Sequence, residues 1–294
     1  MATLNEWIGG SRPRTLPAAV APVVAGTGSA YAIGKASLGY ALLALLVSLA
    51  LQLGVNFAND YSDGIRGTDE DRVGPVRLVG QGLATAANVK LAAFGCFAAA
   101  GVCGLALVAL SGKFWLLLVG IAAIIAAWKY TGGENPYGYM GLGEVFVFVF
   151  FGLVATLGTT YTQAGTLELS SWAAAVGVGA IACAILVANN LRDIPGDTIA
   201  GKRTLAVRLG DRKTRALYVG FLVLALLMAG LAALQHPWAG IAVLGLLPAI
   251  RPTVQVLRQA RGRDLIPVLA GTGITILTYG VLFGLGLYLA YRTA

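Results

Sequence analysis

Long apolar stretches alternate with short polar connections along almost the whole of this 294-residue chain. A membrane-spanning helix needs about 20 mainly apolar residues, and stretches close to that length recur throughout. We predict nine transmembrane helices, at 15–34, 38–60, 88–110, 114–131, 142–164, 172–192, 213–233, 238–257 and 265–291. The pattern therefore indicates an all-α, polytopic membrane protein that forms a single domain over residues 1–294.

Composition supports a membrane protein. Hydrophobic residues make up 57% of the chain and charged residues 12%, whereas about 25% of residues are charged in soluble proteins. We interpret Cys96, Cys103 and Cys183 as buried thiols, because each lies inside an apolar stretch and none has a CxxC partner. The single histidine, His236, lies beside a proline in a short connection and is a poor candidate for a metal ligand.

The charges are distributed very unevenly between the two predicted sides of the membrane. Of the 21 lysines and arginines, only Lys35, Lys113 and Arg292 fall on one side. Basic connections face the cytoplasm, so we expect a cytoplasmic N-terminus and an external C-terminus. The first residues are polar and show no signal-peptide pattern. The net charge of +8 then reflects membrane topology and does not indicate nucleic-acid binding.

Two related polar motifs, at residues 56–69 and 189–197, end the second and sixth apolar stretches. In each motif an asparagine and an aspartate four residues apart share one helix face, and another aspartate follows. Both stretches run in the same direction, so the motifs form a pseudo-repeat at the cytoplasmic side. Ionisable residues at a membrane edge are functional candidates by default. The predicted metal ligands are Asn59, Asp63 and Asp69 from the first motif and Asn189, Asp193 and Asp197 from the second.

These oxygen ligands suit magnesium. Mg²⁺ is usually held by one or two carboxylates together with substrate phosphates, so two facing clusters predict two Mg²⁺ ions on a diphosphate. The catalytic candidates are Asp63, Asp69, Asp193, Asp197 and Lys202. The candidates for binding the diphosphate are Asn59, Asn189, Arg66, Arg72, Arg77, Arg192, Lys202 and Arg203. Asp60 points about 100° away from Asn59 on a helix, so we expect it to cap a backbone group or to pair with Arg66.

A diphosphate bound at the mouth of an apolar bundle favours a substrate with a hydrocarbon tail, such as a prenyl diphosphate. Departure of pyrophosphate leaves an allylic cation, which requires a dry cavity with aromatic faces. Weaker candidates for lining the prenyl and aromatic part of the site are Tyr61, Tyr130, Tyr137 and Tyr139. Phe146, Phe148 and Tyr161 are further aromatic residues available for this wall.

These motifs resemble those of the UbiA superfamily of intramembrane prenyltransferases, all-helical proteins with nine spans and two aspartate-rich motifs. The resemblance is carried by residues 56–69, 71–77, 130–133, 137–139, 141–144, 150–152, 189–193, 197 and 200–210. Within the superfamily, the motifs are most similar to those of the branch that acts on 1,4-dihydroxy-2-naphthoate. The resemblance implies transfer of a polyprenyl group to the ring with loss of CO₂, giving demethylmenaquinone for menaquinone synthesis. It also implies that the two motifs hold Mg²⁺, that Lys202 faces the diphosphate, and that the protein lies in a bacterial cytoplasmic membrane.

Several alternatives stay open at this stage. The residue that holds the aromatic acceptor is not identified, and Glu134, Glu144 or Lys129 could polarise its hydroxyl group. Other acceptors to consider are 4-hydroxybenzoate, homogentisate and a chlorophyll precursor. A secondary transporter of an anionic substrate is the alternative from a different class. Transporter sites lie near the midplane of the bilayer, whereas both motifs here adjoin charged connections, which favours an enzyme.

Overall fold

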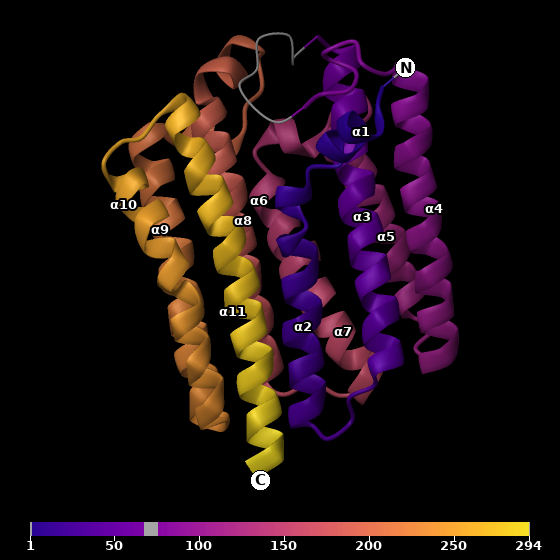
Figure 1. Ribbon diagram of the computed structural model, residues 1–294, viewed down its shortest axis with the longest axis vertical. Coiled ribbons are helices and arrows are strands. Elements are labelled where there is room, and N and C mark those ends of the chain that lie inside the picture. The colour runs from indigo at the N-terminus through magenta and orange to yellow at the C-terminus, as the bar shows by residue number, and fades with distance from the viewer. Residues whose placement is uncertain (1, 68–75, 294) are drawn as a thin grey trace.

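The structure is a computed structural model that describes residues 2–67 and 76–293. It is a bundle of helices, and these residues contain no strand (Figure 1), which confirms the all-α prediction. The helices are α1 (Leu4–Gly10), η1 (Pro13–Thr15), α2 (Pro17–Ala32), α3 (Leu38–Ile65), α4 (Ala86–Ser111), α5 (Leu116–Lys129), η2 (Tyr137–Met140), α6 (Gly143–Val147), η3 (Phe148–Val154), α7 (Ala155–Ala164), α8 (Leu169–Ile199), α9 (Leu205–Gln235), η4 (Pro237–Ala249), α10 (Ile250–Leu257), η5 (Gly262–Leu265) and α11 (Ile266–Thr293).

Each apolar segment predicted from the sequence contains helix in the structure. In the described part of the chain, seven helical stretches are long and apolar enough to cross a membrane. Helices α2 and α5, with 16 and 14 residues, are shorter than the roughly 17–25 residues of a typical transmembrane helix. The seven stretches agree with a multi-pass membrane protein, and the full set of nine spans stays a prediction.

The two ends of the bundle differ in which connections they carry. The N-terminus lies at the same end as the connections between α5 and α6, α8 and α9, and α10 and α11, while the C-terminus lies at the opposite end (Figure 1). Helices α3 and α8 both finish at the end that carries the N-terminus. The two polar motifs and the basic connections are therefore grouped at one end of the molecule.

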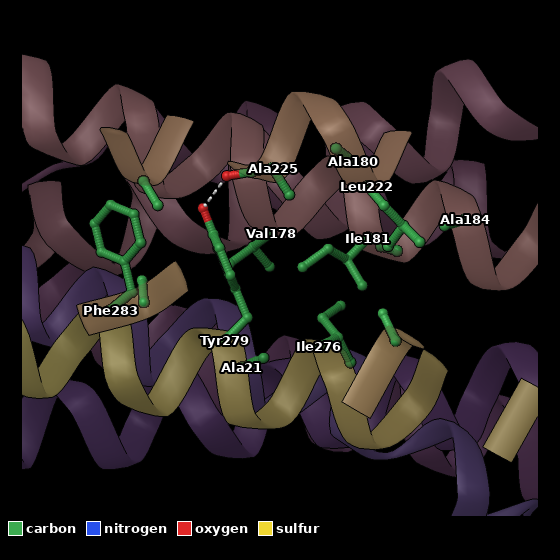
Figure 2. Close-up of a cluster of buried hydrophobic side chains, with 14 of the residues drawn as sticks. Ala21, Val178, Ala180, Ile181, Ala184, Leu222, Ala225, Ile276, Tyr279 and Phe283 are labelled. Carbon is green, nitrogen blue, oxygen red and sulfur yellow. Dashed lines mark hydrogen bonds between the residues drawn. The ribbon is translucent and has the colours of Figure 1, made fainter. Parts of the chain in front are cut away.

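Helix α8 lies at the centre of the larger hydrophobic core and packs on α9, α11, α2 and η3. Val178 and Ile181 of α8 belong to one buried hydrophobic cluster with Leu222 of α9 and Tyr279 of α11 (Figure 2). The Tyr279 hydroxyl donates a hydrogen bond of 2.9 Å to the carbonyl oxygen of Ala225. That bond satisfies the one polar atom of the ring, which allows tyrosine to serve as a core residue.

Small residues let some helices approach until their backbones touch. Gly28 of α2 lies directly against Gly284 of α11, and a Cβ atom added at either position would overlap the other helix. In the same way, a Cβ atom on Gly152 of η3 would lie 2.6 Å from the Cα atom of Gly179 on α8. Close contacts of this kind are the usual basis of helix packing in lipid.

Replacing Gly284 with valine is expected to destabilise the bundle, because the added methyl groups would press on the backbone of α2. Overpacking of this kind costs about 1–3 kcal/mol, which would lower the melting temperature of the purified protein in detergent by several degrees. The matched control is Gly230→Val on α9, where an added Cβ atom meets open space. Equal melting temperatures for the two variants would contradict this packing argument.

The cysteines are free thiols, as predicted, but only Cys183 is buried. Cys96 and Cys103 are partly exposed on α4, so the prediction that they are buried was wrong. Helix α4 packs mainly on α3, which leaves much of its apolar surface uncovered by the rest of the bundle.

Candidate active site

A stripe of polar residues runs down one face of α3. The helix continues through the first motif to Ile65, and Gln52, Asn56, Asn59 and Asp63 follow one another at intervals of three or four residues. All four side chains line one large cavity inside the bundle. On an apolar helix, polar residues at this spacing occupy a single face, so the stripe extends the polar surface of the motif inward.

The cavity has a volume of about 840 Å³, within the range typical of ligand sites. It follows α3 from Asp63 to Ala44, a length of about 28 Å at 1.5 Å per residue. The polar lining residues include Arg12, Asn59, Asp63, Arg77, Asn189, Arg192, Asp197 and Lys202. The apolar lining includes Val23, Ala44, Val47, Leu107, Val119 and Val154. The cavity thus combines a charged mouth with a long apolar interior.

Asp63 is the centre of the charged mouth. Its Oδ1 atom accepts a hydrogen bond from the Tyr139 hydroxyl at 2.5 Å and lies 3.3 Å from the Lys202 ammonium nitrogen. Its Oδ2 atom lies 3.8 Å from a guanidinium nitrogen of Arg77. Asp63, Arg77 and Lys202 are all buried. The fold therefore brings together one carboxylate and two cations from three separate segments.

Tyr139 lies between cations at this mouth. The Lys202 ammonium is 4.4 Å from the centre of the Tyr139 ring, and the Arg66 guanidinium carbon is 5.4 Å from it. Burial, followed by the charge of Asp63, raises the pKa of Tyr139 well above its usual value. The side chain therefore stays a neutral phenol that donates a hydrogen bond to Asp63, while its ring face attracts cations.

The second motif, on α8, forms a compact network of its own. Arg192 donates hydrogen bonds to Asp193 at 2.7 and 2.8 Å and to Asn189 Oδ1 at 2.9 Å. Arg192, Asn189 and Asp197 line the cavity, whereas Asp193 does not. Both oxygen atoms of the Asp193 carboxylate therefore accept hydrogen bonds from Arg192, a residue that lines the cavity.

The remaining predicted residues lie in different places. Tyr61 stacks on Trp128 with ring centres 6.0 Å apart and lies outside the cavity lining. The Arg66 guanidinium donates to the backbone carbonyl oxygens of Thr131 and Gly133 and also lies outside the lining. Arg203 is exposed, and its backbone N–H donates to the Tyr139 carbonyl oxygen at 3.0 Å. Asp69 and Arg72 lie outside the described residues.

Asp60 is buried and holds a connection in place. Its carboxylate accepts hydrogen bonds from the backbone N–H groups of Leu78 and Val79, at 2.7 and 3.0 Å. The expectation that Asp60 caps backbone groups is therefore confirmed. Its alternative pairing with Arg66 was wrong, because the Arg66 guanidinium donates to carbonyl oxygens in the α5–η2 connection.

Aromatic rings cover one wall of the cavity. Tyr130, Tyr137, Phe146 and Phe150 all line it. The rings of Tyr137 and Phe146 stack with centres 3.8 Å apart, and those of Phe146 and Phe150 are 6.1 Å apart. Phe150 belongs to η3, a π-helical segment, and such segments occur often at functional sites. The wall gives the interior a surface that suits a cation or a flat ring.

The other sequence candidates lie away from this wall. Phe148 and Tyr161 are outside the cavity lining, and Tyr161 instead packs against Trp115 with ring centres 5.7 Å apart. Of the three residues considered for polarising an acceptor, Glu134 and Lys129 are exposed and Glu144 is buried. Burial beside the cavity therefore distinguishes Glu144 from the other two.

The donor set at the mouth fits a hard divalent cation. The described residues do not gather three acidic, histidine or cysteine side chains into one cluster. They do present Asn59 and Asp63 from α3 and Asn189 and Asp197 from α8 to the same cavity. Carboxylate and amide oxygens with room for substrate phosphates are the usual surroundings of Mg²⁺.

Several lining residues were missed by the sequence analysis. Gln52 Nε2 donates to Thr15 Oγ1 at 3.0 Å, and Asn56 Nδ2 donates to the Ser11 carbonyl oxygen at 2.8 Å. Arg12 reaches the mouth from the break between α1 and η1, where its φ of 54° places it in the left-handed region. A signal for the α3 residues existed, since their spacing continues that of Asn59 and Asp63. The sequence around Arg12 contains no such signal, because no pattern near it shows that this segment folds over the cavity.

Comparison with known proteins places the chain in a family. Residues 19–270 match the UbiA prenyltransferase family. The chain belongs to this family. Among its UbiA relatives, 1,4-dihydroxy-2-naphthoate octaprenyltransferase of Mycobacterium tuberculosis is 53% identical over 281 residues, covering 96% of each chain. The Escherichia coli protein of the same name is 38% identical and covers 99% of this chain and 97% of the relative.

Solved UbiA structures share the fold. A UbiA homologue from Archaeoglobus fulgidus, bound to GPP and Mg²⁺, superposes with a TM-score of 0.70 at 14% identity, covering 97% of this chain and 99% of the other. A structure of an A. fulgidus homologue bound to Cd²⁺ superposes with a TM-score of 0.68 over the same shares, also at 14% identity. At this identity, the likeness establishes the shared UbiA architecture.

Proposed function

We propose that this protein transfers a polyprenyl group from its diphosphate to 1,4-dihydroxy-2-naphthoate, releasing pyrophosphate and CO₂ and forming demethylmenaquinol, the hydroquinone form of demethylmenaquinone. The observation that carries the proposal is the cavity itself, which joins a mouth with cations and oxygen ligands to a long apolar interior. The naphthoate acceptor is supported by relatives of that name that match nearly the whole chain. The C–O bond to the diphosphate breaks, a C–C bond to the ring forms, and the bond to the carboxylate breaks as CO₂ leaves.

The residues at the mouth would bind and orient the diphosphate. Lys202, Arg77 and Arg12 are cations that line this end, and cationic donors stabilise the negative charge that develops on a departing phosphate group. Two bound Mg²⁺ ions would neutralise further charge, and the chain would hold them through Asn59, Asp63 and Asp69 and through Asn189, Asp193 and Asp197. Asp193 would have to exchange its hydrogen bonds with Arg192 for the second ion in order to act as its ligand.

The interior would protect the reacting carbon from water. The aromatic wall offers ring faces to an allylic cation, and the apolar lining excludes water that would convert the cation to an alcohol. The prenyl tail would lie along α3 toward Ala44. In the membrane we propose nine spans, with the N-terminus and the charged mouth at the cytoplasmic side, because the basic connections share that end. We also propose that the membrane is the cytoplasmic membrane of a bacterium.

A reconstituted assay tests this function. Purified protein in nanodiscs would receive octaprenyl diphosphate, 1,4-dihydroxy-2-naphthoate and Mg²⁺, with EDTA in one control and 4-hydroxybenzoate as acceptor in another. We expect metal-dependent demethylmenaquinol, detected by mass spectrometry as the hydroquinone or, after oxidation in air, as demethylmenaquinone. Product from 4-hydroxybenzoate alone would keep the reaction type and overturn the acceptor. No product with either acceptor, from protein that is monodisperse and folded, would overturn the proposed transfer.

A further inference from the structure

The Glu144 carboxyl group, at the start of α6, has two oxygen atoms with different surroundings. Its side chain is buried, with 5% of the residue exposed. Oε1 accepts a hydrogen bond from Asn190 Nδ2 at 3.0 Å, whereas Oε2 is buried without a hydrogen-bond partner. Leaving a buried carboxyl oxygen unpaired costs stability. A site that retains such a group calls for a functional explanation.

The bond to Glu144 fixes the orientation of the Asn190 amide. A carboxylate only accepts hydrogen bonds, so the amide nitrogen of Asn190 must face Glu144, and its Oδ1 atom points the other way. Asn190 is 8% exposed and lines the cavity. Glu144 itself is held in place through its backbone, since Cys183 Sγ donates to the Glu144 carbonyl oxygen at 3.2 Å. The pair therefore presents one amide oxygen as a hydrogen-bond acceptor.

The aromatic wall and Asn190 line the same cavity. Phe146 follows Glu144 by two residues and stacks on Tyr137. The Tyr137 hydroxyl donates to the Ala126 carbonyl oxygen at 2.8 Å, which fixes its ring. A flat apolar surface and a preoriented hydrogen-bond acceptor in one cavity suit an aromatic ring that carries a hydroxyl group. Asn190 is also rotated by about 100° around α8 from Asn189, so the two amides point in different directions from the helix.

We propose that Asn190 Oδ1 accepts a hydrogen bond from a ring hydroxyl of the aromatic acceptor, and that Glu144 is the positioning residue that holds the amide in this orientation. The inference rests on the proposed function, which supplies a hydroxylated acceptor. The hydrogen bond orients the ring on the aromatic wall and draws the hydroxyl proton toward the amide. Electron density on the ring rises, which favours attack on the allylic carbon.

The test compares Glu144→Leu and Glu144→Gln, with Glu134→Leu as the matched control at an exposed position. Each protein is assayed with 1,4-dihydroxy-2-naphthoate and with analogues that lack one of the two hydroxyl groups. In the wild type we expect removal of the bonded hydroxyl to lower kcat/KM about tenfold or more. In Glu144→Leu we expect the KM for the naphthoate to rise about tenfold and the KM for the prenyl diphosphate to stay unchanged. We also expect the hydroxyl preference to disappear, meaning that kcat/KM becomes similar for the naphthoate and for the analogue that lacks the bonded hydroxyl group.

The intrinsic reactivity of each analogue cancels in this comparison, because it is the same in both proteins. Glu144→Gln keeps an oxygen that accepts from Asn190 Nδ2, so we expect it to retain the wild-type preference. Where Glu144→Leu does not give folded protein, Asn190→Leu carries the same comparison.

Three results would overturn this inference: an intact hydroxyl preference in Glu144→Leu, an equal rise in KM for both substrates, or loss of the preference in Glu144→Gln. The wild-type arm tests the proposed function separately. If the wild type forms no product, the transfer assignment fails. A productive wild type with any of the three results overturns the positioning role alone.

Discussion

Asparagine in place of Asp63 is expected to lower turnover about a thousandfold, equivalent to ~4 kcal/mol of transition-state stabilisation. The amide oxygen still accepts the hydrogen bond from Tyr139, so the local packing is preserved. What the variant loses is the negative charge that lies between Lys202 and Arg77 and that would hold a divalent cation. The measurement is the initial rate of product formation as a function of Mg²⁺ concentration. We expect a higher Mg²⁺ requirement as well as a lower maximum rate.

The matched control is Asp264→Asn, which changes an exposed aspartate in η5 and leaves the cavity untouched. It is expected to behave as the wild type. Alanine at Asp63 is expected to lose at least as much activity, because it also removes the acceptor for Tyr139. A rate near that of the wild type in either Asp63 variant, from folded protein, would remove Asp63 from the metal site.

The apolar pattern was sufficient to predict the helices. A segment that lies in lipid must form hydrogen bonds among its own backbone groups, and a helix does this. It did not distinguish kinds of helix. The stretch predicted at 142–164 contains the π-helical η3, and the stretch predicted at 238–257 begins with the 3₁₀ helix η4. In the sequence, both segments look like ordinary apolar stretches. Each of the two unusual helices has a glycine in close contact with another helix: Gly152 of η3 lies against Gly179, and Gly245 of η4 lies against the backbone of Tyr279.

The candidate site was predictable to the extent that its residues are local in sequence. The i, i+4 spacing predicted that Asn59 and Asp63 share a face, and both line the cavity. Contacts across the fold gave no such signal. Asp63 meets Tyr139 and Lys202, which are 76 and 139 residues away. The same is true of Glu144 and Asn190, 46 residues apart. Such contacts depend on how the helices pack against one another, and this packing cannot be deduced from a single sequence.

Methionine in place of Lys202 is expected to weaken binding of the prenyl diphosphate and to strengthen binding of Mg²⁺. The reason is that the Lys202 ammonium group has two roles, one toward the diphosphate and one toward the Asp63 carboxylate. Lys202 lines the cavity mouth where the diphosphate would bind, so loss of its charge should lower kcat/KM for the prenyl diphosphate about a hundredfold. In the structure it also lies 3.3 Å from the Asp63 carboxylate. A cation at that distance competes with Mg²⁺ for the same oxygen atoms.

Removing Lys202 should therefore lower the Mg²⁺ concentration that gives half-maximal activity, even though the maximum activity falls. Lys213→Met, at an exposed position on α9, is the control and should change neither quantity. The measurement is a Mg²⁺ titration of the rate at several concentrations of prenyl diphosphate. A loss of activity with an unchanged or higher Mg²⁺ requirement would show that Lys202 does not compete for Asp63. An unchanged KM and rate for the prenyl diphosphate would exclude Lys202 from its binding site. Asp63 and Lys202 form one ion pair, and their variants should shift the Mg²⁺ requirement in opposite directions. We expect it to rise in Asp63→Asn and to fall in Lys202→Met.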